Sequence, residues 1–124
     1  MGLTYRKVSS AFQVGKDEKV ACVIALGYGE DKYRTHKIKS RSAVSNADDL
    51  TPDWFIKGVD AALLAPTAVN QQKFFFELIP GKKEGKMKVK ASTLFSMLGY
   101  TKMDLGIAKC HFEIGAGKDN FEWA

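Results

Sequence analysis

The side chains best suited to chemistry in this sequence are short hydroxyl and amide groups that follow Pro66. Thr67, Asn70, Gln71 and Gln72 lie together there. Such groups must form hydrogen bonds if they are enclosed. In one interpretation they face a ligand rich in hydrogen-bond donors and acceptors. In the other, Thr67 and Asn70 satisfy backbone groups of their own turn. The residues alone leave both interpretations open.

No catalytic constellation accompanies this cluster. The chain has no Gly-x-Ser-x-Gly elbow, no Gly-Lys-Ser/Thr phosphate loop and no dinucleotide-binding glycine pattern. Asp48, Asp49 and Asp104 are isolated carboxylates that fit capping or surface roles. The two cysteines and two histidines lack the spacing of a ligand set, so we expect no metal. This pattern is compatible with a flavoenzyme, whose cofactor carries the electrons.

Two predicted elements would position the polar cluster. The segment from Thr51 to Ala65 predicts a helix, with Thr51 as its cap, Pro52 in its first turn and Pro66 after its end. The segment Phe74–Ile79 predicts a strand that is apolar on both faces, so we expect both faces to be covered. Apolar residues alternate with lysines over Met87–Ala91, which predicts a hairpin with that strand.

Three further elements are predicted. The apolar run Val20–Leu26 predicts a central strand, and Asn120–Trp123 a short terminal strand. A second long helix is expected over Thr101–Ile114, with Gly115 as its cap and Gly106 as a point of close packing. Its core-facing stripe would consist of Met103, Ile107, Cys110 and Ile114, widened by Leu105, Ala108 and Phe112.

The formal net charge of the chain is +5, and the basic residues form two groups. One lies in the aperiodic segment Glu30–Leu50, and the other lies in and before the second strand of the predicted hairpin. Basic surface is usually only solvated, and the alternatives are a phosphate-bearing ligand or nucleic acid. Nucleic acid is the weaker alternative because no nucleic-acid-binding motif accompanies the charge.

Length and composition favour one globular domain over residues 1–124. The hydrophobic content is 45%, and no apolar run approaches the ~20 residues that a membrane span needs. No N-terminal segment resembles a signal peptide. We expect Cys22 and Cys110 to be reduced, buried thiols in a cytoplasmic protein.

Three segments resemble a known family. Ala65–Gln72 reads Ala-Pro-Thr-Ala-Val-Asn-Gln-Gln and resembles the Ala-Pro-Ser-x-x-Asn-x-Gln-Pro-Trp segment of the FMN-dependent nitroreductases. Val20–Gly29 and Lys102–Ala108 resemble a strand-and-turn and a helix of the same family. The chain is most similar to the C-terminal half of the branch described as putative nitroreductases. It departs from the family pattern at Lys73 and Phe74, which stand where Pro-Trp is usual.

The resemblance implies an α+β fold, with a mixed β-sheet flanked by helices, in a partial version of the nitroreductase architecture. It also implies an oxidoreductase that uses a nicotinamide donor to reduce a small acceptor through FMN, held at the interface of an intertwined dimer. By position, Thr67, Ala68 and Asn70 would contact the flavin or line the dimer side of its pocket. Lys37 and Lys39 are the nearest matches to the basic residues that approach the flavin phosphate.

The family's N-terminal arginine-rich phosphate anchor has no match near Met1. The chain is therefore expected to be either a single nitroreductase-like domain or a C-terminal fragment of one, which would pair with a second copy or with a missing half. A domain that keeps the fold without flavin is the main alternative function, and a basic nucleic-acid-binding domain is a less favoured one.

Overall fold

The computed structural model describes residues 14–20, 26–28, 37–79 and 87–124. The chain forms two units, Met1–Arg34 and Thr35–Ala124, and the helices and strands of the described residues all lie in the second. In the first unit, Glu18 N donates to Gly15 O (3.1 Å) and closes a turn. Residues 21–25 of the predicted strand Val20–Leu26 lie outside the described residues.

Helix α2 (Asp53–Leu63) is the helix predicted before the polar cluster. Its core face repeats at helical spacing and consists of Phe55, Gly58, Val59, Ala62 and Leu63. The predicted cap is wrong by one residue, because Pro52 occupies the N-cap position. The Thr51 hydroxyl is used elsewhere: it accepts from Asp48 N (2.8 Å) and donates to Asp48 Oδ1 (2.9 Å).

The predicted hairpin is confirmed. Strands β1 (Phe74–Ile79) and β2 (Met87–Thr93) pair antiparallel, with Phe76 opposite Ala91. The C-terminal strand β3 (Phe121–Trp123) pairs parallel with β2. The order β1-β2-β3 makes a mixed three-stranded sheet, so the predicted α+β class with a mixed sheet is correct.

A short helix that the sequence did not predict, α1 (Arg41–Val44), precedes a segment that covers the outer edge of β1. Ser45 forms a parallel bridge with Phe76. The Asn46 amide then continues the ladder, because Nδ2 donates to Leu78 O (3.1 Å) and Oδ1 accepts from Leu78 N (2.8 Å). Outward backbone groups of Phe76 and Leu78 are thereby paired, so this part of the edge is not left open.

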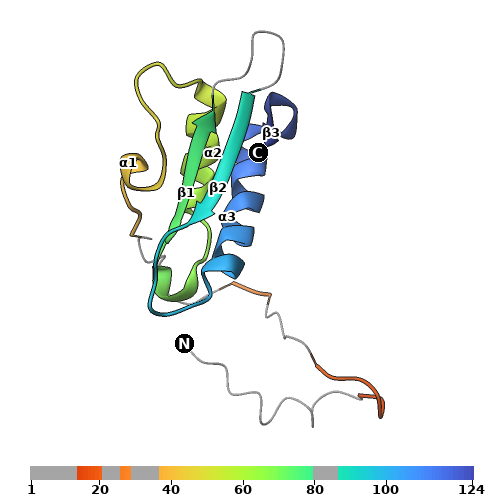
Figure 1. Ribbon diagram of the computed structural model, residues 1–124. Coiled ribbons are helices and arrows are strands. Elements are labelled where there is room, and N and C mark those ends of the chain that lie inside the picture. The colour runs from red at the N-terminus through yellow and green to blue at the C-terminus, as the bar shows by residue number, and fades with distance from the viewer. Residues whose placement is uncertain (1–13, 21–25, 29–36, 80–86) are drawn as a thin grey trace. The chain divides into compact units, whose positions relative to one another are not determined.

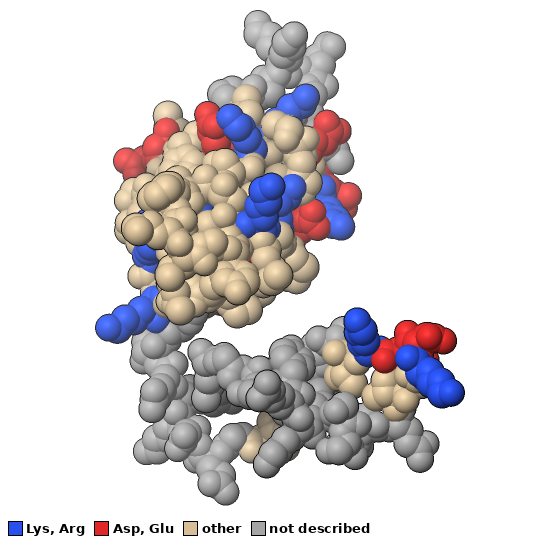
Figure 2. Space-filling view, turned by 60° about the horizontal axis from the view of Figure 1, so that its bottom comes forward, with Lys and Arg blue, Asp and Glu red and all other residues tan. Residues whose placement is uncertain are grey.

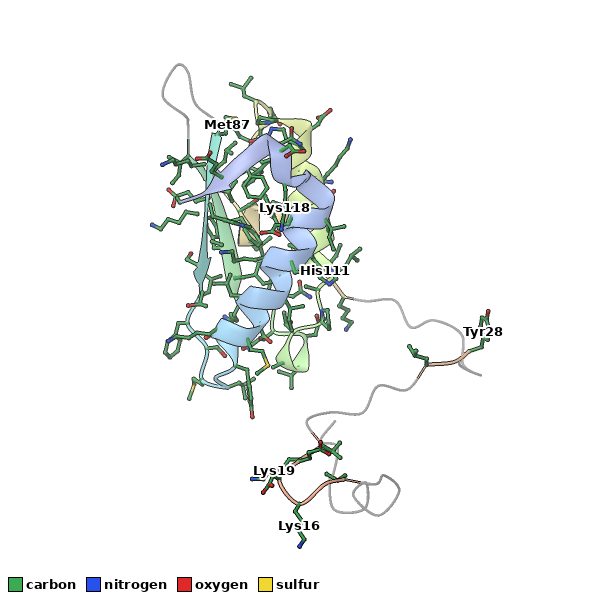
Figure 3. All side chains as sticks on the ribbon, turned by 90° about the vertical axis from the view of Figure 1, so that its right-hand side faces the viewer. Lys16, Lys19, Tyr28, Met87, His111 and Lys118 are labelled. Atoms are coloured by element: carbon green, nitrogen blue, oxygen red, sulfur yellow. The ribbon has the colours of Figure 1, made fainter. Side chains whose placement is uncertain are left out.

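Helices α2 and α3 (Thr101–Ala116) lie side by side on one face of the sheet (Figure 1). Viewed from the helix side, His111 lies on α3 and Lys118 follows its end (Figure 3). Aromatic side chains dominate the core between the layers. The Phe76 and Phe112 rings stack with centroids 4.6 Å apart, and Phe121 meets Phe112 edge-on at 5.3 Å. No helix in the described part of the chain is long and apolar enough to cross a membrane.

Glycines let α2 and α3 approach closely. A Cβ at Gly115 would lie 2.5 Å from Lys57 O, and one at Gly58 would lie 2.8 Å from the Phe112 ring. Gly115 is therefore a packing residue inside α3, and the prediction that it caps the helix is wrong. Gly117, with φ 77°, is the C-terminal cap. The prediction of close packing at Gly106 is also wrong, since a Cβ there meets nothing within 4 Å.

Gly115→Ala should destabilise the fold by about 1–3 kcal/mol, because the added methyl overlaps the Lys57 carbonyl and forces the helices apart. Gly106→Ala is the matched control in the same helix. It should stabilise by about 0.5–1 kcal/mol through helix propensity alone. Urea unfolding of both variants measures the difference. Equal effects of the two substitutions would contradict the close approach of the helices.

The core-facing stripe of α3 differs from the predicted one. The buried positions are Asp104, Ala108, Phe112 and Ala116. Met103 and Ile114 are exposed, and Cys110 is an exposed free thiol, so the expectation of a buried Cys110 is wrong. Gly115 and Ala116 lie where α2 passes closest, and the Phe112 ring packs against α2 because Gly58 has no side chain. Of the apolar side chains of the predicted stripe, Met103 and Ile114 are exposed, whereas Leu105 and Ile107 pack partly against the core.

Within the described part of the chain, only one face of the sheet is covered. Phe74 and Phe76 are buried beneath the helices, whereas Phe75 and Ile79 on the opposite face are half-buried and Glu77 is exposed. Lys90 lies 3.9 Å from Glu77 on this second face. The expectation that both faces are covered is thus not met within the described residues of this chain.

Candidate functional site

The polar cluster forms a tight turn between α2 and β1, which we call the junction turn (Ala68–Gln72). A 3₁₀ helix, Ala68–Asn70, makes up most of it, with Thr67 as the N-cap residue. Asn70 N donates to Thr67 O (2.9 Å) and Gln71 N donates to Ala68 O (3.0 Å). The turn lies between the end of α2 at Leu63 and the start of β1 at Phe74.

The junction turn is strained. Val69, Asn70 and Gln72 have φ values of 46°, 54° and 45°, in the left-handed region. Asparagine tolerates this region, but a β-branched valine there is an outlier. Each such residue costs about 1–3 kcal/mol and persists only where its surroundings hold it. Strained backbone of this kind gathers at binding and catalytic sites, so the turn is the first candidate for function.

Gln72 holds the junction turn from inside. Its side chain is buried, with 1% exposure. Nε2 donates to Lys37 O and to Asn70 Oδ1 (2.7 Å each), and Oε1 accepts from Lys39 N (2.9 Å). Gln72 N donates to Thr67 Oγ1 (3.0 Å). One amide thus joins the turn to the segment Lys37–Lys39, more than thirty residues earlier in the chain.

The two lysines make different contacts with the turn. The Lys39 ammonium donates to Gln71 O (2.8 Å) and Gln72 O (2.9 Å), and burial together with the charge of Lys73 lowers its pKa. Lys37 contacts the turn through its backbone, since its carbonyl accepts from Asn70 Nδ2 (2.8 Å). The Lys37 side chain is exposed and pairs with no described acid.

A second set of contacts holds the opposite side of the turn. Asp104 Oδ1 accepts from Ala68 N (3.0 Å), and Asp104 Oδ2 accepts from Gln71 Nε2 (2.6 Å). Gln71 Nε2 also donates to Gly99 O (3.1 Å), and Gln71 Oε1 accepts from the Ser96 hydroxyl. The start of α3 and the loop before it are thereby joined to the turn.

The five residues predicted to bind the cofactor lie together: Lys37, Lys39, Thr67 and Asn70 bond to Gln72 or to one another, and Ala68 lies in the same turn, bonded to Asp104. Sequence reasoning missed the roles of Gln71, Gln72 and Asp104. The interpretation of Asp104 as an isolated carboxylate is wrong, since its bonding partners lie 33 and 36 residues away.

The local-bonding interpretation also holds for part of the cluster. Thr67 Oγ1 accepts from a backbone N–H within the turn, and the Asn70 amide bonds to Lys37 and Gln72. The outer edge keeps capacity for a ligand: Asn70 is exposed, and the Thr67 hydroxyl keeps its proton to donate. Together with the exposed Lys37 ammonium, this edge offers an amide, a hydroxyl and a cation.

Apolar side chains adjoin the turn at the same end of the fold. Val69 is 75% exposed, Phe95 84% and Met97 93%, and Leu98, Tyr100 and Met103 are also exposed. Figure 2 shows this end, where uncharged side chains cover most of the surface. The hydrogen bonds of Gln71 to Ser96 and Gly99 fix the loop that carries four of these side chains against the turn. An uncharged surface of this kind beside a polar edge fits a flat aromatic ligand or another protein surface.

Acids neutralise part of the basic surface. Arg41 donates two hydrogen bonds to the Asp60 carboxylate, at 2.6 and 2.8 Å, and Lys118 pairs with Glu113 at 3.0 Å. Among the described residues that contact or adjoin the junction turn, Lys37, Lys39 and Lys73 form no ion pair.

Residues 1–116 match a family model described as "Putative TM nitroreductase". The matched region includes the junction turn, Lys37, Lys39 and Asp104. Neither the curated proteins nor the solved structures contain a significant match to this chain.

Proposed function

Since the chain belongs to the family described as "Putative TM nitroreductase", we propose that it is an FMN-binding oxidoreductase that passes electrons from a nicotinamide donor to a small acceptor. The observation that carries this proposal is the strained junction turn. Its buried side is bonded completely to Gln72 and Asp104, while its outer edge keeps polar groups beside an apolar surface.

The groups at this edge fit the chemistry of FMN. The isoalloxazine ring has a polar edge with hydrogen-bond donors and acceptors, which the Asn70 amide and the Thr67 hydroxyl complement. The apolar residues beside the turn suit the flat faces of the ring. The Lys37 ammonium suits the phosphate.

Bound FMN would supply the redox chemistry, by accepting a hydride equivalent from the nicotinamide and giving electrons to the acceptor. The chain's own residues then have three tasks. Asn70 and Thr67 orient the ring, the exposed apolar side chains exclude water from it, and the lysines neutralise the phosphate. No proton-transfer residue is required of the turn.

Lys37 and Lys39 should contribute to FMN binding in different ways. Lys37→Ala should weaken FMN binding by about tenfold to a hundredfold, since a charge-assisted contact contributes about 1.5–3 kcal/mol. It should leave riboflavin, which lacks the phosphate, almost unaffected. Lys39→Ala should weaken the binding of both ligands, because the Lys39 ammonium also donates to the Gln71 and Gln72 carbonyls.

Flavin titrations at two ionic strengths measure these differences, since exposed charge contacts weaken with salt. The control is Lys88→Ala, which removes the same charge from an exposed position on β2. If Lys37→Ala weakens FMN and riboflavin equally, the assignment of Lys37 to the phosphate is wrong.

We also propose that the chain acts as a dimer, as the family resemblance implies. Three apolar areas support this: the half-buried Phe75 and Ile79 on the second face of the sheet, the exposed Ile114 on α3, and the apolar surface beside the turn. Exposed apolar side chains that gather on one surface are common at protein–protein interfaces. A second copy could cover these surfaces and enclose the flavin between the subunits.

A further inference from the structure

Asp104 is a buried carboxylate in the described part of the chain, with 3% exposure. None of the ion pairs among the described residues includes it. Its charge is satisfied by the Ala68 N–H, by the Gln71 amide and by its place in the first turn of α3, near the positive end of the helix dipole.

A buried carboxylate without a cation needs a structural or functional reason. Burying such a charge costs free energy of folding. A protein with an apolar residue of similar size at the same core position is often no less stable. The neighbouring positions on the same face of α3, Ala108 and Phe112, are apolar as expected. The two oxygens of Asp104 must therefore be explained by what they bind.

Both donors belong to the junction turn, one at its first residue and one near its last. Between them lie Val69 and Asn70, two of the left-handed residues. A single rigid carboxylate thus fixes the spacing of Ala68 and Gln71, and with it the left-handed path between them. Gln72 cannot do this alone, because its contacts run to the opposite side, toward Lys37 and Lys39.

We infer that Asp104 is a positioning residue, which holds the junction turn in its left-handed shape and so presents the Asn70 and Thr67 groups to the ligand. This inference rests on the proposed function for the identity of the ligand. Asp104 does not itself contact the ligand in this account, because both of its oxygens are bonded to the turn. Without it, Val69 and Asn70 should relax toward right-handed conformations, and the Asn70 amide should leave its place.

The test compares Asp104→Asn with Asp53→Asn. The first keeps the size of the side chain and can still accept from Ala68 N, but its amide cannot accept from Gln71 Nε2. The control removes an exposed carboxylate from the first turn of α2, so both variants lose the same helix-dipole interaction. Amide hydrogen exchange reports on the turn without any ligand. Titration with FMN and with riboflavin reports on binding.

Asp104→Asn should speed exchange in the junction turn at least tenfold more than exchange in the paired strands β1 and β2. It should lower the affinity for FMN and the affinity for riboflavin by a similar factor, of about tenfold. Adding Val69→Gly should restore much of the affinity, because glycine adopts the left-handed conformation without strain. Packing alone would not predict this rescue. If Asp104→Asn does not fold, Gln71→Leu is measured in its place, with Ser96→Ala as its control, because Gln71→Leu removes the bond to Asp104 together with the bonds to Ser96 and Gly99.

Equal acceleration of exchange in the turn and the strands would overturn the inference, as would flavin affinity that Asp104→Asn leaves unchanged. If the wild-type protein binds neither flavin, the proposed function fails. The exchange comparison between turn and strands then decides the positioning role separately.

Discussion

Replacing Gln72 with alanine is expected to destabilise the fold by about 3 kcal/mol or more and to abolish flavin binding. The substitution leaves Lys37 O, Lys39 N and Asn70 Oδ1 without the bonds that Gln72 supplies. Lys37 O keeps its bond from Asn70 Nδ2, whereas Lys39 N loses its partner, and an enclosed polar group left unpaired costs about 1–3 kcal/mol. The cavity left by the side chain adds to this cost. Urea unfolding, followed by flavin titration below the unfolding transition, measures both effects.

Gln72→Glu distinguishes the contribution of the hydrogen bonds to stability from that of the side-chain volume. Glutamate fills the same space and can accept from Lys39 N, but it cannot donate to Lys37 O or Asn70 Oδ1. We expect it to be at least as destabilising as alanine at neutral pH, since it also buries a charge. A Gln72→Glu protein as stable as the wild type would show that Gln72 merely fills space.

The second large effect concerns association. We expect the melting temperature to rise with protein concentration, because dimer formation and folding should be coupled if the exposed apolar areas lie in the interface. An obligate interface of this type buries more than ~2,000 Å² in total. Ile114→Glu would place a charge on the outer face of α3 and should shift the protein toward monomer. Lys57→Glu, at an exposed position of α2 that forms no ion pair among the described residues, is the control.

Sedimentation at low micromolar concentration, with melting curves over a hundredfold range of concentration, measures this association. A well-folded monomer whose melting temperature does not change with concentration would contradict the dimer. It would favour a self-contained fold in which one face of the sheet is open to solvent.

The hairpin and α2 could be predicted because their signals are local. Alternation with lysines marks β2, and helical spacing with a following proline marks α2. The buried face of α3 could not be predicted in the same way. That helix has apolar residues on two faces. The buried one carries Phe112, which packs on Gly58, and small residues where Gly115 brings α2 closest, while Met103 and Ile114 of the predicted stripe are exposed.

The residues of the candidate site could be predicted from the sequence, but the hydrogen bonds and the backbone conformation that hold them could not. The hydroxyl and amide residues after Pro66 were recognisable, and the family resemblance connected them with Lys37 and Lys39. The hydrogen bonds of Gln72 to Lys39 and of Asp104 to Ala68 cross more than thirty residues. The left-handed backbone at Val69 leaves no sign in the side-chain pattern, since valine disfavours it.

The most direct test of the account is a flavin titration of the purified wild-type protein, followed by the visible absorption and fluorescence of FMN. We expect saturable binding of one FMN per chain. We also expect Asn70→Ala to weaken this binding by about fivefold to a hundredfold, as for a lost amide contact of about 1–3 kcal/mol that the bound flavin encloses. Folded wild-type protein that does not bind FMN, or equal affinity in the two proteins, would contradict the account.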